Sequence, residues 1–233
     1  MERTLISRII PGTEVKVQGF LERVRNTGAM AFLVLRDRTG KVQVTIEKAV
    51  HPELAEELNN LTPESIVTVE GTAAANPQVR LNGLEILPER LVIESLAVPL
   101  PLNKDAAVDT RMDYRWLELR GEKERLLFEV QTCLVSAMRQ FLAERDFLEI
   151  HTPKLIAAAS ESGADVFEVK YFDRKAYLAQ SPQFYKQMAM AAGFERIFET
   201  GPVFRAEKSF TNRHATEFSG FDLEFSYIES FED

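Results

Sequence analysis

Alternation of apolar and polar residues dominates the first hundred positions and predicts a set of short β-strands. Five such runs are separated by turn signals rich in Gly, Asn and Pro: 14–25, 30–37, 41–47, 65–74 and 84–95. A short helical insert, residues 51–61, falls between the third and fourth runs. Five strands with a helix in that place are the layout of an OB-fold barrel. Residues 1–100 are therefore expected to form a small β-barrel domain.

The period of the apolar positions changes from two to 3.6 after residue 121. Residues 101–121, rich in charge and entered through a proline, predict a hinge. Residues 122–145 then predict a long amphipathic helix whose apolar stripe is expected to face a core: Leu126, Val130, Cys133, Leu134, Ala137, Met138, Phe141 and Leu142. A strand, 147–152, follows and stops at Pro153. Residues 122–233 are thus expected to form a second domain, and the whole chain an α+β protein.

Two strand-like runs near the end of the chain concentrate polar chemistry. The period of two places Val203, Arg205 and Glu207 on one face of a strand. After a polar loop, residues 217–227 alternate again. One face carries Phe218, Gly220, Asp222, Glu224 and Ser226. The other, expected to face a core, carries Ser219, Phe221, Leu223, Phe225 and Tyr227.

These polar groups on one surface favour a ligand site, because buried polar groups are costly unless something satisfies them. The alternative is a salt-bridged hairpin with a solvated face, and the pattern alone does not decide between the two.

A short helix, residues 181–192, is predicted just before these strands. Ser181 is expected as its N-cap and Pro182 as its first helical residue, and Gly193 ends it in the C′ position. Spacing gives the helix two faces, one with Gln183 and Lys186 and another, expected to face the core, with Phe184 and Met188.

The charge balance limits what the barrel can bind. A net charge of −8 argues against binding nucleic acid over the whole surface, although a local patch would suffice. Five basic residues and a single acid, Asp37, lie between Arg23 and Lys41. Phe32 lies inside this cluster, so Phe32, Arg23, Arg25 and Gln43 could supply an aromatic plate, charge and a base-edge reader for single-stranded nucleic acid. A solvated strand face on a scaffold barrel is the alternative.

Other features narrow the class of protein. Cys133 is the only cysteine, which excludes a disulfide within the chain and indicates the cytoplasm. No apolar run reaches the roughly 20 residues of a membrane span, and the first residues lack a signal-peptide core. Neither a glycine-rich phosphate loop, nor zinc-ligand spacing, nor a Gly-x-Ser-x-Gly elbow is present.

Several long segments together resemble the class II aminoacyl-tRNA synthetases, specifically the aspartyl-tRNA synthetase family of the archaeal and eukaryotic type. Residues 147–153 match motif 1, residues 204–207 with 213–218 match motif 2, and residues 180–187 and 110–120 match further family signatures. The resemblance covers essentially the whole chain in the expected order. It implies an N-terminal OB-fold anticodon-binding domain, followed by part of the class II antiparallel catalytic sheet with flanking helices.

The resemblance implies an aspartate–tRNA ligase, which activates aspartate with ATP to aspartyl-adenylate and transfers it to tRNA. By resemblance, Arg205 binds the α-phosphate and stabilises charge at the reacting centre. Phe218 stacks on adenine, and Glu207 supports the ATP or the tRNA end. Arg213 and His214 approach the γ-phosphate.

The aspartate site is implied in the same way, with Asp222, Gln183 and nearby Ser181 for the ammonium group, Lys186 for the side-chain carboxylate, and a closing loop that contains Glu161, Ser162 and Gly163. Lys186 separates the substrates, because a buried cation left unpaired by a neutral amide is costly. The asparaginyl enzymes, which the chain otherwise resembles, do not as a rule carry a lysine there. Aspartate is therefore expected rather than asparagine.

In the barrel, the resemblance implies that Phe32 and Gln43 stack on and read the anticodon, with Arg23 or Arg25 on phosphates. Motif 3 and the carboxylates that hold Mg²⁺ are not among these residues, so residues 1–233 alone are not expected to form the adenylate. Robust aspartate-dependent ATP–pyrophosphate exchange would contradict that expectation. The whole enzyme is expected to be a homodimer through motif 1.

Three alternatives stay open from the sequence. They are a non-catalytic tRNA-binding module, an asparaginyl-tRNA synthetase, and an amidating paralogue, against which the barrel argues.

Overall fold

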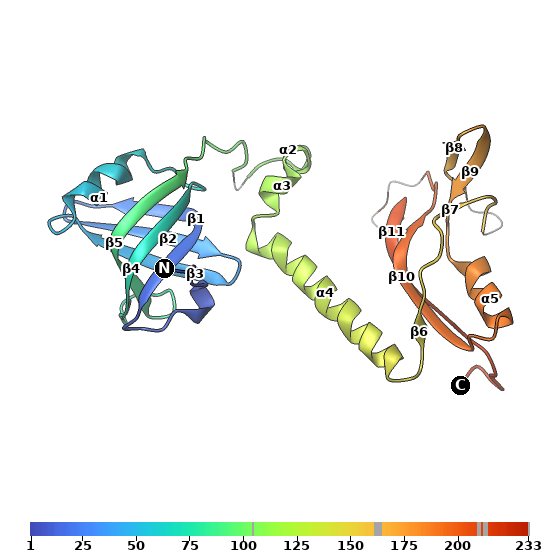
Figure 1. The fold of residues 1–233 in the computed structure, drawn as a ribbon. Coiled ribbons are helices and arrows are strands. Elements are labelled where there is room, and N and C mark those ends of the chain that lie inside the picture. Colours follow the sequence, from blue (N-terminus) through green and yellow to red (C-terminus); the bar gives the residue numbers. More distant parts are fainter. Residues whose placement is uncertain (104, 161–164, 209–210, 212–213, 233) are drawn as a thin grey trace. The chain divides into compact units, whose positions relative to one another are not determined.

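The computed structural model of the protein describes residues 1–103, 105–160, 165–208, 211 and 214–232. It divides into two compact units, Met1–Glu118 and Leu119–Asp233 (Figure 1). The division falls inside the predicted hinge, and we keep residues 101–121 as a proposed connector between two domains. The predicted α+β class is confirmed.

The first unit is a closed barrel in the order β1-β2-β3-β5-β4. Its strands are β1 (Glu14–Asn26), β2 (Met30–Asp37), β3 (Gly40–Glu47), β4 (Ile66–Ala75) and β5 (Leu84–Ser95). The five predicted runs are thus confirmed to within one residue at each end. The helical insert between the third and fourth strands is α1 (Pro52–Glu57) followed by the 3₁₀ turn η2 (Leu58–Asn60). A further 3₁₀ turn, η1 (Ile6–Arg8), precedes the barrel.

Alternate residues of every strand fill the barrel interior, as the period of two requires. Leu21, Leu33, Leu35, Ile46 and Ile86 are completely buried there. Closure brings backbones so near that a Cβ at Gly71 would lie 2.2 Å from the carbonyl oxygen of Leu87, so this position requires glycine. Residues between two interior positions point outward, which places Phe32 and Gln43 on the barrel surface.

Two short helices lie in the proposed connector, α2 (Val108–Asp113) and α3 (Arg115–Glu118). Glu118 joins them, because its carboxylate pairs with Arg115 and lies 3.4 Å from Nη1 of Arg111. This part of the proposed connector thus forms two short helices rather than one long helix.

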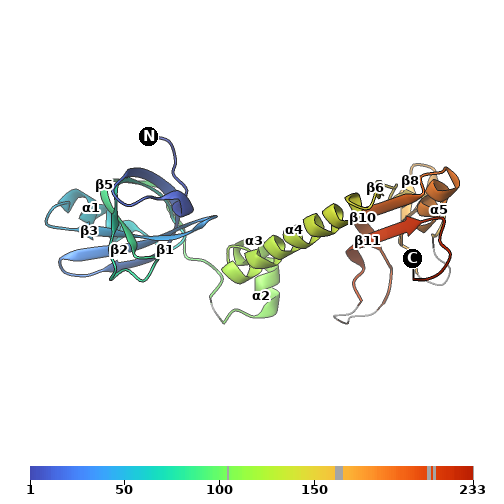
Figure 2. The ribbon, with the colours of Figure 1, turned by 90° about the horizontal axis from the view of Figure 1, so that it is seen from below.

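The second unit contains α4 (Glu122–Ala143), α5 (Gln183–Ala191) and two small sheets. One sheet has the order β11-β10-β6, from β11 (Glu217–Phe225), β10 (Arg196–Phe204) and β6 (Leu148–Glu149). The other has the order β7-β9-β8, from β7 (Leu155–Ile156), β9 (Arg174–Leu178) and β8 (Glu168–Tyr171). The antiparallel pair β10–β11, visible side by side in Figure 2, carries the polar residues singled out from the sequence.

The long amphipathic helix is confirmed as α4, but its expected burial is wrong for the part of the chain described. Leu126, Val130, Leu134 and Phe141 are each more than half exposed, and Cys133 is exposed. Only Leu142, at the C-terminal end of the stripe, is buried. The described elements of this unit therefore leave most of the apolar face of α4 uncovered. None of the described helices is both long enough and apolar enough to cross a membrane.

Candidate active site and barrel surface

The register of β10 and β11 defines a polar face. Gly201 lies opposite Gly220, with Val203 opposite Phe218 on one side of this glycine pair and Glu199 opposite Asp222 on the other. The predicted grouping of Phe218, Gly220, Asp222 and Glu224 on one face is therefore confirmed, and Glu199, Gly201 and Val203 join it from β10.

The opposite face of the hairpin is only partly the core that the alternation predicted. Phe198 and Phe221 stack there, with ring centroids 5.7 Å apart. Leu223, however, is 41% exposed. The strand ends at Phe225, and Tyr227 lies beyond it with φ = 60° and a largely exposed ring. The part of the expectation that placed Tyr227 in a buried strand position is wrong.

Arg205 lies just after β10 rather than inside it, because the strand ends at Phe204. The predicted strand face of Val203, Arg205 and Glu207 is therefore interrupted. The Arg205 backbone N–H still donates to the carbonyl oxygen of Thr216 at 2.9 Å. Its Cζ lies 5.5 Å from the centroid of the Phe218 ring. A guanidinium and a partly exposed aromatic ring thus meet at one end of the polar face.

The connection between β10 and β11 brings two more predicted residues together. His214 Nε2 lies 3.8 Å from Glu207 Oε2, and His214 Nδ1 is hydrogen-bonded to the Thr211 hydroxyl at 2.7 Å. Arg213, Glu161 and Ser162, with Gly163, lie outside the described residues, so the structure does not place them.

Helix α5 begins differently from the prediction. Pro182, not Ser181, is the N-cap, and Gln183 is the first helical residue. Ser181 still contributes, since its Oγ accepts a 3.4 Å hydrogen bond from the Gln183 N–H. Gly193, with φ = 83°, follows the C-cap as expected.

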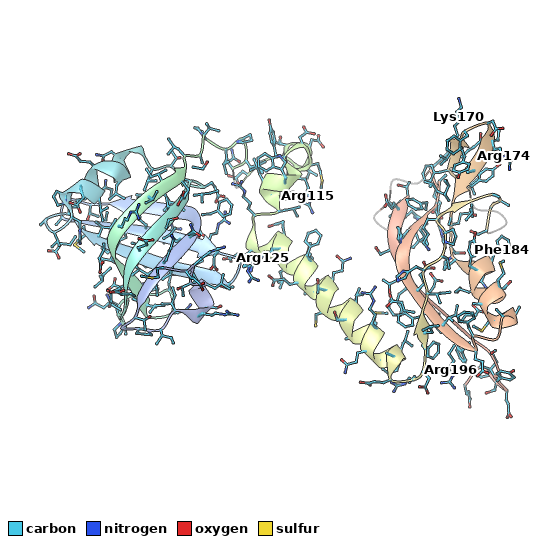
Figure 3. The ribbon with its side chains drawn as sticks, in the orientation of Figure 1. Arg115, Arg125, Lys170, Arg174, Phe184 and Arg196 are labelled. Carbon is cyan, nitrogen blue, oxygen red and sulfur yellow. The ribbon has the colours of Figure 1, made fainter. Side chains whose placement is uncertain are left out.

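The faces of α5 are also assigned differently. Phe184 and Met188, expected in the core, are 49% and 60% exposed in the part of the chain that the structure describes. Phe184 is labelled on α5 in Figure 3. The buried residue of the helix is Lys186, which is only 6% exposed.

Lys186 is the best-defined polar feature of the second unit. Its Nζ lies 3.2 Å from Asp222 Oδ1 and 3.4 Å from Glu224 Oε2. It also donates to the carbonyl oxygen of Leu223 at 3.4 Å. Sequence reasoning placed Glu224 on the correct face but did not include it in the site. The structure therefore contains a buried cation shared by two carboxylates.

A second ion pair on the same face was not foreseen. Glu199 is 3% exposed and lies 2.9 Å from Lys154 Nζ. It also accepts hydrogen bonds from the N–H and the hydroxyl of Thr152, at 2.9 and 2.7 Å. Burial by itself would raise the pKa of Glu199, but the bonds from Lys154 and Thr152 outweigh burial and lower the pKa below its usual 4.5. Glu199 is therefore ionised at neutral pH.

Ser181 is placed apart from this cluster. It lines a largely apolar cavity of about 520 Å³ together with Ile156, Phe184, Met188 and neighbouring residues. Gln183, Lys186 and Asp222 do not line that cavity. Of the predicted aspartate-site residues, Asp222 contacts Lys186, whereas Ser181 lines this cavity and accepts the bond from the Gln183 N–H.

On the barrel, the four predicted nucleic-acid residues share the outer face of β1, β2 and β3. Arg25 lies opposite Phe32, and Arg23 lies opposite Val34, which in turn lies opposite Gln43. Both arginines are exposed. This register places the four side chains on one outer surface of the barrel.

Glu85, which was not predicted from the sequence, binds several polar side chains next to Gln43 on that surface. Its carboxylate is 8% exposed and accepts bonds from Thr45 Oγ1 at 2.5 Å and Asn76 Nδ2 at 2.8 Å. Gln43 Nε2 contacts Thr45 Oγ1 at 3.0 Å and Glu85 Oε2 at 3.4 Å. These contacts fix the orientation of the Gln43 amide, and Thr45 is in turn the register partner of Phe32.

Metal ligands are a separate question. Within the described ranges, no group of three or more His, Cys, Asp or Glu side chains is arranged to hold a metal ion.

Comparisons with known proteins place this geometry in a family. The pattern of the tRNA synthetases class II (D, K and N) matches residues 107–232, and that of the OB-fold nucleic acid binding domain matches residues 15–93. The predicted OB-fold and class II sheet are thereby confirmed.

Individual relatives agree with these patterns. An aspartate–tRNA(Asp/Asn) ligase of Methanopyrus kandleri is 49% identical over 95% of this chain and 53% of its own length. An aspartate–tRNA(Asp) ligase of Pyrococcus horikoshii is 42% identical over 97% of this chain and 52% of its own. The asparaginyl-tRNA synthetase of Pyrococcus horikoshii, solved with asparaginyl-adenylate, superposes with a TM-score of 0.92 at 34% identity, covering 98% of this chain and 54% of its own.

The chain thus spans about half the length of the curated relatives it matches. The matches cover both of its units. The chain belongs to the class II tRNA synthetases of the D, K and N group.

Proposed function

We propose that this chain provides the anticodon-binding barrel and the amino-acid and ATP-binding hairpin of an aspartate–tRNA ligase. The observation that carries the proposal is the buried Lys186, held by Asp222 and Glu224 on the face where Arg205 meets Phe218. The relatives named as aspartate–tRNA ligases support the same function.

The amino acid is proposed to bind around Lys186. The Lys186 ammonium attracts the side-chain carboxylate of aspartate, while Asp222, with Gln183, attracts the α-ammonium. Asparagine would offer Lys186 only a neutral amide oxygen in place of a carboxylate, and a cation binds a neutral acceptor less strongly than a charged one. Ser181, Glu161 and Ser162 complete the proposed site.

ATP is proposed to lie across the glycine pair 201 and 220, with adenine on Phe218. The α-carboxylate oxygen of aspartate forms a bond to the α-phosphorus, and the bond from that phosphorus to the β-phosphate bridging oxygen breaks. Arg205 stabilises the charge that develops on the α-phosphate oxygens, a task suited to a rigid guanidinium. Glu207, His214 and Arg213 are proposed to contact the nucleotide from the loop. Mg²⁺ would neutralise phosphate charge, and its ligands are expected outside residues 1–233.

Transfer to tRNA completes the proposed reaction. A hydroxyl of the terminal ribose attacks the activated carbonyl carbon, and AMP leaves. The barrel holds the anticodon by stacking a base on Phe32, with Gln43 at the base edge and Arg23 or Arg25 on phosphates. The uncovered apolar face of α4 supports the further proposal of a homodimer through motif 1, and a cytoplasmic location fits this function.

Ligand binding by the chain itself tests the amino-acid site. Titration with L-aspartate, followed by NMR of the Lys186 and Asp222 side chains, is expected to shift both sets of signals, and L-asparagine is expected to shift them only at much higher concentration. A preference for asparagine would instead favour an asparaginyl-tRNA synthetase. Binding of tRNA without any response to aspartate or ATP would favour a non-catalytic tRNA-binding module.

Catalysis is tested in a chimera in which residues 1–233 replace the matching segment of the Methanopyrus kandleri ligase. The chimera is expected to catalyse aspartate-dependent ATP–pyrophosphate exchange, with the unmodified ligase as the positive control. Residues 1–233 alone are expected to give no exchange above background.

Phe32→Ala is expected to weaken binding of aspartate tRNA by about 1–3 kcal/mol, roughly 5- to 150-fold, because a base loses its stacking partner. Filter binding at one fixed salt concentration measures the effect, since phosphate contacts make affinity salt-dependent. The matched control is Phe172→Ala, which removes an 82% exposed ring outside the barrel. Equal losses in the two variants would contradict the barrel as the anticodon site.

A further inference from the structure

Three carboxylates and two lysines share the polar face of the β10–β11 hairpin. Glu199 lies directly opposite Asp222 on this face, and like charges at directly opposite positions destabilise a sheet. Glu199 and Asp222 pair with two different lysines, each from another part of the chain. Lys154, between β6 and β7, pairs with Glu199 at 2.9 Å, and Lys186, on α5, pairs with Asp222 at 3.2 Å.

Both ion pairs lie next to the glycine pair, on the side where Glu199 lies opposite Asp222. A Cβ at Gly201 would lie 3.4 Å from Lys154 Cε and 3.5 Å from Glu199 Oε1, so the Lys154–Glu199 pair lies within van der Waals distance of this position. A Cβ at Gly220 would lie 3.0 Å from Asp222 Oδ2. The Lys154–Glu199 pair is therefore a neighbour of the proposed substrate position, not a remote surface bridge.

Glu199 carries a fixed charge at this position. It is almost completely buried, and its three hydrogen bonds keep it ionised. An ionised, buried carboxylate acts on nearby groups with little screening by solvent. Lys154 is the only cation with an ion pair to Glu199 among the described residues. Lys154 thus determines whether Asp222 faces a neutral pair or a bare negative charge.

We propose that Lys154 is a positioning residue of the amino-acid site, which neutralises Glu199 and so keeps Lys186 on Asp222 and Glu224. The inference rests on the proposed function for the statement that this site binds an amino acid. With Lys154 absent, Lys186 would be the nearest cation for three carboxylates instead of two. Lys186 would then be less available to the carboxylate of the substrate.

The test is a carboxyl ¹³C NMR titration of Asp222 in the 233-residue chain. The charged groups facing Asp222 are Lys186 from α5, Glu199 from β10 and Glu224 from its own strand. Lys154→Met, which leaves Glu199 uncompensated, is expected to raise the pKa of Asp222. Glu199→Gln, which leaves the Lys154 cation, is expected to lower it. The double variant, in which both charges are removed, is expected to return towards the unmodified chain.

Lys175→Met is the matched control, because it removes an exposed lysine paired with Glu168 on the β8–β9 hairpin. It is expected to leave the Asp222 titration unchanged. An unchanged pKa in folded Lys154→Met, or shifts of the same sign in both single variants, would overturn the proposal.

A folding failure of Lys154→Met does not remove the test. Glu199→Gln must still lower the pKa of Asp222, and Lys154→Arg, which keeps the charge, must leave it unchanged. A raised or unchanged pKa of Asp222 in Glu199→Gln, or a changed pKa in Lys154→Arg, would overturn the role of Lys154. The titration requires no substrate, so its failure leaves the ligase assignment standing, whereas absence of aspartate binding by the unmodified chain counts against the proposed function.

Discussion

Lys186→Met is expected to weaken aspartate binding by at least about 100-fold, since breaking a buried ion pair costs about 3–5 kcal/mol. Methionine keeps the length and apolar stem of the side chain but removes the charge. Asp222 and Glu224 then lose the cation that they share at 3.2 and 3.4 Å. The substrate carboxylate would meet these two carboxylates without an intervening positive charge. Calorimetric titration of the chain with L-aspartate measures the loss.

The same substitution should also reduce the preference for aspartate over asparagine. Parallel titrations with the two amino acids give this ratio, and the exchange rate of the chimera gives its catalytic counterpart. Lys175→Met serves again as the control, because an exposed surface pair contributes little. Undiminished aspartate binding by Lys186→Met would rule out Lys186 as the residue that recognises the substrate carboxylate.

Arg205→Lys is expected to slow adenylate formation in the chimera by about 100- to 1,000-fold, the range found when one preorganised donor to a developing negative charge is removed. Lysine keeps the charge but loses the planar fork that can hold two phosphate oxygens at once. It would also lose the guanidinium placement against Phe218, where Cζ lies 5.5 Å from the ring centroid. ATP–pyrophosphate exchange at saturating aspartate measures the rate.

Aspartate affinity should change by no more than about twofold in Arg205→Lys, because Lys186, Asp222 and Glu224 are untouched. Arg196→Lys is the matched control. Arg196 is the first residue of the same strand and is exposed, and its side chain donates to the carbonyl oxygen of Arg145. If Arg205→Lys retained more than half of the exchange rate, the proposed role at the α-phosphate would be wrong.

Phe218, Gly220, Asp222 and Glu224 show what the alternation of residues could determine. A strand turns alternate side chains to opposite faces whatever it pairs with, so the shared face of these four residues follows from the sequence. The five barrel strands follow for the same reason. The helical stripe of α4 is equally local, but its partner is not. Amphipathicity identifies which side is apolar and not what covers it, so the expected burial of Leu126 or Phe141 was wrong.

Helix α5 shows which burial the periodicity of the sequence could not predict. Phe184 and Met188 are the more hydrophobic residues and were assigned to the core, yet Lys186 is the residue that is buried. Two carboxylates from β11 make this burial tolerable, because a buried charge needs paired partners. This pairing depends on how α5 packs against β11, and the periodicity of the helix alone does not predict that packing.

The sequence by itself determined the five barrel strands, the two longer helices α4 and α5, and the polar face of β11, because these depend on neighbours only a few residues away. The tertiary structure alone decided which faces meet. Lys186 reaches Asp222 across 36 positions, Thr45 reaches Glu85 across 40, and Thr152 reaches Glu199 across 47. Such pairs are fixed by register and docking, so the charge array of the candidate site could be described only once the chain had been folded.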